Sequence, residues 1–375
     1  MIFLNILAQI YKFIYTSKLT NKKNTNIEVF HRIYIVFFIT LRSYKRLRMK
    51  RFKLIATSIA LCCWMAAPAQ QTSDGEAKGK AIIQVFGNFH SGFGHDNNDR
   101  GFELDRSYLG YQYDLGKGLQ IKGVMDIGQS DDVNDYHRIA YIKNALISWK
   151  TGNLTLTGGL IPTTQFNMQE KFWGYRYIMK SFKDLYKFGN SADLGISATY
   201  KFTDWLSADA IVVNGEGYKK IQKEDGLMYG LGATLTPVEG LSLRIYYGLN
   251  ESIEENQKDK QNLATFIGYK GKGFSLGAEY NLYMNDKNQE GADLYGLSIY
   301  GSASLNKKTE LYARYDNLSS KDNWNEAKDQ SGIIAGLQFK LGKYVKIAPN
   351  FRMNIPKAES ADNKYMGYIS CYFGL

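Results

Sequence analysis

Apolar and polar residues alternate with a period of two along most of the chain beyond residue 70. The alternation comes in stretches of about ten residues, the length of strand that crosses a membrane barrel. In segment 240–250, for example, the apolar set is Leu241, Leu243, Ile245, Tyr247 and Leu249. Successive side chains of a strand point to opposite faces, so each such stretch predicts a strand with one apolar and one polar face.

Sixteen segments share this pattern, each bounded by Gly, Asn, Asp or Lys. The predicted strands are 80–91, 102–114, 119–129, 138–150, 154–161, 192–203, 205–214, 226–236, 240–250, 261–270, 273–284, 292–303, 309–318, 331–341, 344–355 and 364–375. Tight links alternate strictly with longer polar ones, as expected when short turns lie at one rim of a barrel and long loops at the other. The prediction is an all-β fold, a sixteen-stranded antiparallel transmembrane β-barrel.

A soluble β-sandwich is the alternative architecture, and it predicts only about seven to nine strands around a shared core. It does not predict aromatic residues near strand ends, such as Trp149, Tyr200 and Trp205, which are typical of membrane interfaces. A barrel of sixteen strands is too wide for its side chains to fill, so we expect an aqueous channel.

The third long connection, Pro162 to Ser191, is far longer than joining neighbouring strands requires. Its aromatic and Met residues recur at spacings of three and four, which predicts one face of a short helix: Phe172, Tyr175, Met179, Phe182 and Tyr186. A cationic set runs beside them, namely Arg176, Lys180, Lys183 and Lys187, with Lys171 nearby. We expect this third loop to fold inward, its aromatic face on the wall and its cations lining a pore constriction. A surface lid with solvated charges is the other interpretation.

The alternation also predicts which charged residues face the lumen. If the apolar residues of each strand face lipid, the residues that alternate with them must face the inside of the barrel. The cations expected to face inward are Arg106, Lys122, Arg138, Arg244, Arg314 and Arg352, and the acids are Asp126, Glu279, Glu310 and Asp316. A lone inward Arg is more often the partner of a carboxylate than a solute ligand. Several clustered near a constriction would favour anions.

Charge is distributed unevenly along the chain. The 47 Lys and Arg outnumber 36 Asp and Glu, but twelve of the bases and one of the acids lie in residues 1–53, so the rest holds 35 of each. This balance excludes a nucleic-acid partner recognised through its phosphates. All 36 glycines follow residue 69.

The charge and glycine boundary predicts three regions. Residues 49–69 have a basic start, an apolar core and a small-residue cleavage pattern at Ala67-Pro68-Ala69, which predicts a signal peptide for export. Residues 1–48 are expected to be an untranslated leader, and residues 70–375 a single barrel domain. Helical membrane anchors are the alternative, but the apolar runs fall short of the roughly 20 residues needed to span a bilayer. Beyond residue 69 only Cys371 remains, which excludes an internal disulfide.

The region from residue 70 onward resembles the phosphate-selective porin O and P family. The resemblance rests on Arg106-Ser107-Tyr108-Leu109-Gly110-Tyr111, on Gly158-Gly159-Leu160-Ile161-Pro162 and on Val213-Asn214-Gly215-Glu216-Gly217. It implies a homotrimeric outer-membrane porin of a Gram-negative bacterium, whose basic third loop passes anions such as phosphate. No single lysine of this loop is matched to a family lysine.

The function predicted is passive diffusion of small hydrophilic solutes, neutral or anionic, through a barrel surrounded by outer-membrane lipid. We expect no cofactor and no bound metal. A structural or adhesive barrel with a blocked lumen is an alternative, and an outer-membrane lipid hydrolase is another. For hydrolysis the region offers His90, beside Ser91, together with His95 and His137, but no Gly-Xaa-Ser-Xaa-Gly motif.

Overall fold

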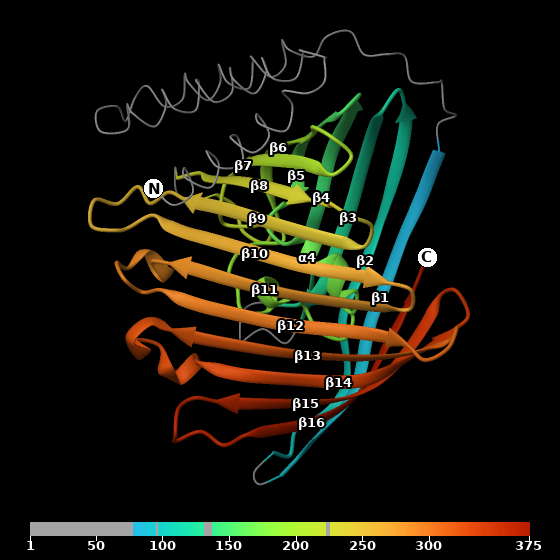
Figure 1. Cartoon of the computed structure of the whole chain (residues 1–375), viewed down its shortest axis with the longest axis vertical. Coiled ribbons are helices and arrows are strands. Elements are labelled where there is room, and N and C mark those ends of the chain that lie inside the picture. Colours follow the sequence, from blue (N-terminus) through green and yellow to red (C-terminus); the bar gives the residue numbers. More distant parts are fainter. Residues whose placement is uncertain (1–77, 95–96, 131–136, 223–225) are drawn as a thin grey trace. The chain divides into compact units, whose positions relative to one another are not determined.

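The computed structural model describes residues 78–94, 97–130, 137–222 and 226–375. The predicted leader and signal peptide lie outside these residues. Within them, sixteen strands form one closed antiparallel barrel in which each strand pairs with its sequence neighbours and β1 pairs with β16 (Figure 1). The predicted fold class is therefore confirmed. No helix among the described residues is long and apolar enough to span a bilayer.

The strands match the sixteen alternating segments, with ends that differ by two residues at most. They are β1 (Lys78–Phe93), β2 (Arg100–Gly116), β3 (Leu119–Gln129), β4 (Arg138–Thr151), β5 (Leu154–Pro162), β6 (Ala192–Lys201), β7 (Leu206–Val213), β8 (Met228–Leu235), β9 (Leu241–Asn250), β10 (Lys260–Gly271), β11 (Phe274–Met284), β12 (Leu294–Ser304), β13 (Thr309–Ser320), β14 (Gln330–Leu341), β15 (Val345–Pro356) and β16 (Lys364–Gly374).

Short turns join β2 to β3, β4 to β5 and every later pair in the same series, while the longer connections lie at the opposite rim. The long connections include two short helices, α4 (Asn167–Trp173) and α5 (Phe182–Leu185). Three 3-10 turns also occur there, at Asp286–Asn288, Lys321–Asn323 and Glu326–Lys328.

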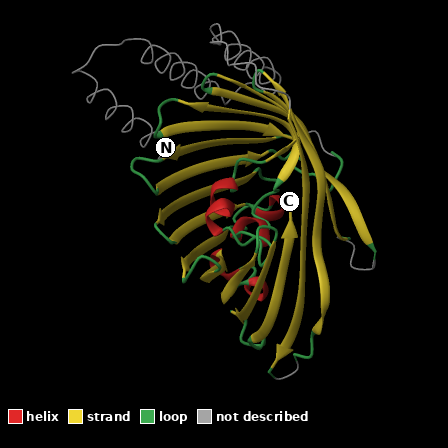
Figure 2. Cartoon of the chain, turned by 90° about the vertical axis from the view of Figure 1, so that its right-hand side faces the viewer, coloured by secondary structure: helices red, strands yellow, loops and turns green. Residues whose placement is uncertain are grey.

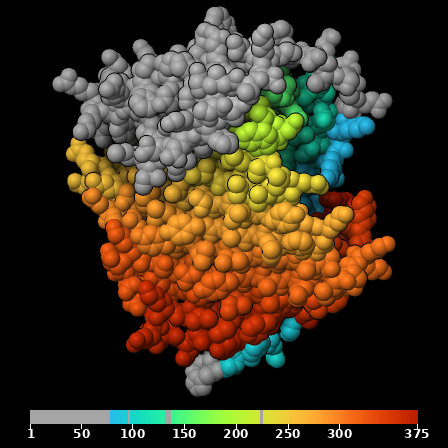
Figure 3. Space-filling model, in the orientation of Figure 1, coloured from blue at the N-terminus to red at the C-terminus, as the bar shows by residue number. Residues whose placement is uncertain are grey.

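The outer face of the barrel is apolar because one side-chain set of each strand points away from the lumen. Ile142, Ile267, Leu276 and Ile299 are all more than half exposed on strands in different parts of the wall. The later strands form a continuous surface in the space-filling view (Figure 3). An exposed apolar band over a closed sheet is typical of a barrel surrounded by lipid.

Candidate functional site: a loop inside the barrel

The connection between β5 and β6, residues 163–191, runs inside the barrel, and we refer to it as the inner loop. Its two ends are joined by a hydrogen bond from the Thr163 amide to the Ser191 carbonyl at 3.1 Å. Both of its helices lie within the ring of strands (Figure 2). The loop reaches strands far from its origin, because the Tyr177 hydroxyl donates to Gln338 on β14 at 2.9 Å.

The inner loop does not form the single short helix predicted from its aromatic spacing. Helix α4 ends at Trp173 because Gly174 adopts a left-handed conformation with φ of 73°, which favours glycine. The chain then turns before α5 begins at Phe182. The one-helix prediction was therefore wrong, and the cationic residues do not form a helical stripe.

Aromatic side chains nevertheless attach the inner loop to the wall. Phe172 packs edge-on against Phe266 of β10 with ring centroids 4.9 Å apart. Tyr175 stacks on Tyr312 of β13 at 4.6 Å. Such pairs contribute about 0.5–1.5 kcal/mol beyond the area that they bury.

Three wall arginines hold backbone carbonyls of the inner loop. Arg244 on β9 donates to Thr164 at 2.7 Å, Arg314 on β13 donates to Lys180 at 2.6 Å, and Arg352 on β15 donates to Ile178 at 2.7 Å. These arginines face the lumen, and their guanidinium groups provide hydrogen-bond partners for carbonyls of the loop that lie outside its helices.

Two of these arginines also bind carboxylates on the wall. Arg244 contacts both oxygens of Asp209, at 2.7 and 3.0 Å, and Arg314 contacts both oxygens of Asp316, at 2.7 and 2.6 Å. Bidentate pairs of this kind are strong and directional. Arg244 and Arg314 therefore fix the loop in place and are already occupied by acids.

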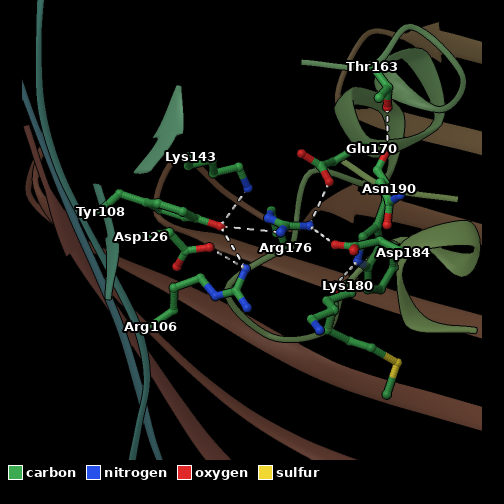
Figure 4. A network of polar contacts seen from close by, with 12 residues as sticks. Arg106, Tyr108, Asp126, Lys143, Thr163, Glu170, Arg176, Lys180, Asp184 and Asn190 are labelled. Atoms are coloured by element: carbon green, nitrogen blue, oxygen red, sulfur yellow. Dashed lines mark hydrogen bonds and ion pairs between the residues drawn. The ribbon is translucent and has the colours of Figure 1, made fainter. Parts of the chain in front are cut away.

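A polar network lies between the inner loop and β2 to β4 (Figure 4). Three cationic side chains donate to the hydroxyl of Tyr108 on β2: Arg106 at 3.1 Å, Lys143 of β4 at 3.1 Å and Arg176 of the loop at 3.3 Å. Arg106 also contacts Asp126 of β3 at 3.2 Å. The network joins the loop to β2, beside β1, where Tyr177 of the loop also approaches Phe86 with ring centroids 6.4 Å apart.

The loop cations differ in their surroundings. Lys171, Lys180 and Lys187 are exposed, while Arg176 pairs with Glu170 at 2.7 Å and with Asp184. Lys183 is completely buried, and its ammonium group donates to Asn262 of β10 at 2.8 Å. The prediction that Lys183 lines the pore was therefore wrong, because α5 presents this side chain to the wall.

Among the six cations expected in the lumen, Arg138 is misplaced. A β-bulge in β4, where Val124 pairs with Asn144 but Met125 pairs with Ile142, adds Lys143 as an extra residue. The bulge reverses the alternation of inward and outward side chains, so Lys143 faces inward. Arg138, the first residue of β4, shares the even-numbered positions of Ile142, whose side chain points outward. Lys122 shares the inward parity of Asp126.

Charge in this region is positive on balance. The network in Figure 4 contains four cations, Arg106, Lys143, Arg176 and Lys180, and three carboxylates, Asp126, Glu170 and Asp184. Burial raises the pKa of Asp184, but the opposing charges of Arg176 and Lys180 outweigh it and hold that pKa below its usual value. Although the Lys180 side chain is exposed, partial loss of water around its nitrogen lowers its pKa; Asp184 opposes this shift, and Arg106 and Arg176 add to it.

An open hollow lies beside the end of the inner loop. Its lining includes the cations Lys187, Lys220 and Lys260 and the acids Asp193 and Glu216. Asp193 accepts the backbone amides of Gly215 and Gly217 at 2.8 and 3.1 Å, which orders the neighbouring loop.

Residues missed by the sequence analysis include Tyr108, Lys143 and Asn262. Tyr108 lies two residues from Arg106 on the same face of β2, so strand parity could have identified it. The position of Lys143 depends on the bulge, and the role of Asn262 depends on a contact with a residue 79 positions away.

The structure separates the residues considered for hydrolysis. The His90 ring contacts Asn88 at 2.8 Å and Asp99 at 3.3 Å, whereas the Ser91 hydroxyl donates to the Gly92 carbonyl. Adjacent strand residues point to opposite faces, so His90 and Ser91 do not form a nucleophile and base pair. In the described part of the chain, no group of three or more His, Cys, Asp or Glu residues is placed to hold a metal.

Comparisons with known proteins agree with this architecture. The model of a family described as "Putative beta-barrel porin-2, OmpL-like" matches residues 185–359, from within the inner loop through β15. The matching family is not the phosphate-selective porin O and P family, so that resemblance stays a prediction. A search of curated proteins finds no significant match.

Solved porin structures share the fold at low sequence identity. OmpF of Salmonella typhi, in complex with daunomycin, has a TM-score of 0.63 at 12% identity and covers 80% of this chain and 98% of its own. An anion-selective porin from Comamonas acidovorans has a TM-score of 0.60 at 14% identity, covering 80% and 100%. OmpT of Vibrio cholerae has a TM-score of 0.58 at 14% identity, covering 82% and 100%.

Proposed function

We propose that this protein is a passive outer-membrane channel of a Gram-negative bacterium that passes small hydrophilic solutes and favours anions. The single observation that carries the proposal is the inner loop, fastened inside a closed sixteen-stranded barrel by wall arginines. A loop that narrows a wide lumen without filling it leaves a constriction lined by the groups on both sides.

The preference for anions rests on which cations remain available. Arg244 and Arg314 are bound by carboxylates, and Lys183 is buried. Lys122 and Lys143 on the wall, together with exposed Lys180, carry the positive charge on the side of β2 to β4. Fixed positive charges beside a narrow aqueous path raise the local concentration of anions.

Phosphate is the solute implied by the family resemblance, and we propose it as one of the anions that pass through the channel. A homotrimer is the proposed assembly, and an exported precursor with a cleaved signal peptide at residues 49–69 is the proposed route to the membrane.

Solute uptake into liposomes tests the channel itself. Vesicles that contain the purified protein should swell in neutral sugars of increasing size until a cut-off is reached, while empty vesicles should not. Competition between phosphate and chloride currents then tests phosphate selection. Absence of both swelling and current would favour the structural barrel with a blocked lumen.

A further inference from the structure

Lys183 lies on α5 of the inner loop, and its side chain has no exposed surface. Its side-chain nitrogen donates to the side-chain oxygen of Asn262 at 2.8 Å, and no carboxylate of the described chain lies within 4.0 Å of that nitrogen. Lysine is almost never fully buried without an ionic partner, because removing the charge from water costs several kcal/mol. Structural packing alone would be served better by an apolar side chain.

Asn262 connects Lys183 to both ends of the inner loop. Its amide nitrogen donates to the Gln165 side chain at 3.0 Å and to the Phe188 carbonyl at 3.2 Å. Gln165 lies near the start of the loop and Phe188 near its end. Asn262 therefore contacts the start of the loop, its end and α5, and the contact with α5 is made by Lys183.

Other charged and titratable groups face Lys183 from the neighbouring strands. On β9, the Tyr246 ring lies 5.5 Å from its nitrogen, and Arg244 repels the charged form. On β11, the buried Glu279 attracts it without forming an ion pair. On the loop itself, neighbouring Asp184 pairs with Arg176 instead.

We propose that Lys183 is a positioning residue that fastens the inner loop at the constriction, and that protonation of its side chain weakens this attachment. The test by current rests on the proposed channel function. Attachment of the loop can also be measured by fluorescence, which does not depend on that function. It assigns Lys183 to control of the loop rather than to contact with solutes.

The direction of the pH dependence follows from burial. Burial lowers the pKa of Lys183 to about 7; Glu279 opposes this, and Arg244 adds to it. A released loop would return the side chain to water, where lysine has a pKa of about 10.4. Between these values the attached loop binds fewer protons than the released one, so attachment strengthens as pH rises. The ratio of attached to released loop should change by up to about tenfold per pH unit and level off below pH 7.

Single-channel recording from pH 6 to 10 tests the proposal. In the wild type, brief conductance changes caused by release of the loop should become up to about fifty-fold rarer between pH 7 and pH 9. Lys183→Met keeps the apolar stem but cannot titrate, so its event frequency should not depend on pH. Lys187→Met, which removes an exposed lysine from the same loop, should behave as the wild type does.

Glu279→Gln separates the two titratable groups. Without the attracting carboxylate, the pKa of Lys183 should fall further. The event frequency should therefore still depend on pH, but it should become constant only at a lower pH than in the wild type. If Glu279→Gln abolished the dependence while Lys183→Met retained it, the proposal would be overturned and Glu279 would be the sensor.

Tryptophan quenching provides a readout that needs no current. Trp324 packs against the cluster that contains Phe182 and Phe188 on either side of Lys183. Quenching of Trp324 by acrylamide, obtained as the difference between the wild type and Trp324→Phe, should decrease from pH 7 to pH 9 and be constant in Lys183→Met. A quenching change without any current would support the attachment and refute the channel. Current without pH dependence in either readout would refute the attachment alone.

Discussion

The guanidinium of Arg176 donates to the hydroxyl of Tyr108 at 3.3 Å, and this contact joins the inner loop to the wall on β2. Arg176 is also held by Glu170 and Asp184, which are residues of its own loop. Its charge is therefore largely balanced before a solute arrives. The contact narrows the lumen, and the cations around it belong to the wall as much as to the loop.

Anion preference should therefore depend on Lys122, Lys143 and Lys180 more than on a continuous stripe along the loop. Neutralising Arg176 would leave two acids without a partner and would alter the shape of the constriction. Neutralising a wall lysine removes charge while leaving these pairs intact.

The register of β3 and β4 can be tested by thiol labelling in a Cys371→Ser background. Cysteine at Lys122 or Lys143 should react with a charged, water-soluble thiol reagent, whereas cysteine at Ile121 or Ala145 should be protected by lipid. The physical reason is that side chains of a strand alternate between lumen and lipid, and the bulge places Lys143 inside. Equal behaviour of Lys143→Cys and Ala145→Cys, whether both react or both are protected, would show that the bulge is absent, because regular alternation places these two positions on the same face.

Arg244 should contribute strongly to stability. Its side chain is 6% exposed and its partner Asp209 is 8% exposed, so Arg244→Ala leaves a buried carboxylate without a cation. Removing one partner of such a pair costs about 3–5 kcal/mol. The midpoint of urea unfolding in detergent should fall accordingly.

A matched control comes from an exposed pair, Lys201 with Asp204, whose side chains are 53% and 100% exposed. Lys201→Ala should leave the midpoint of urea unfolding almost unchanged, because an exposed ion pair contributes little to stability. Equal losses in the two variants would mean that the Arg244 pair is not buried in the folded protein.

The strands were predictable because each carries its own alternation and its own turn residues. The segment 119–129, for example, is β3 without any change of bounds. The parity that places Arg244, Arg314 and Arg352 inside follows directly from this local pattern. It does not reveal the bulge at Lys143, because a bulge changes how the residues of β4 pair with β3 and leaves no mark on which residues are present.

The path of the inner loop could be expected only in outline. Its length and its aromatic residues indicate packing on an inner wall, but its anchors join residues far apart in sequence, such as Arg352 and Ile178, 174 positions apart. Gly174 was the available sign that the helix would stop, since glycine is common just beyond a helix end. The burial of Lys183 depends on which face α5 presents, and that is fixed by Asn262 on a distant strand.

Titration of Lys180 should make selectivity depend on pH. Partial loss of water around its nitrogen and its cationic neighbours lower the pKa of Lys180 from its ordinary value, with Asp184 opposing them. Because the charged form is lost at a lower pH than usual, anion preference should decline as pH rises towards 10. Reversal potentials measured between pH 7 and 10 would record this decline.

Two replacements at position 180 provide the controls. Lys180→Arg remains charged throughout, so its anion preference should decline less than that of the wild type over this range. Lys180→Gln should start from a weaker preference and also decline less than the wild type. An unchanged decline in Lys180→Gln would assign the titration to another group.

The central claim is that Lys122 and Lys143 of the wall, together with Lys180 of the inner loop, give the channel its anion preference, and the zero-current potential in asymmetric potassium chloride tests it most directly. Each cation beside the constriction should contribute roughly 1 kcal/mol, less at high salt. The reversal potential of the wild type should lie towards the equilibrium potential of chloride. In the triple variant Lys122→Gln, Lys143→Gln, Lys180→Gln it should shift towards the equilibrium potential of potassium, while the channel still conducts. Lys258→Gln with Lys321→Gln removes cations paired to Glu290 and Asp293 on outer loops and should change little. A wild-type channel that prefers potassium, or a triple variant with unaltered reversal potential, would contradict the account.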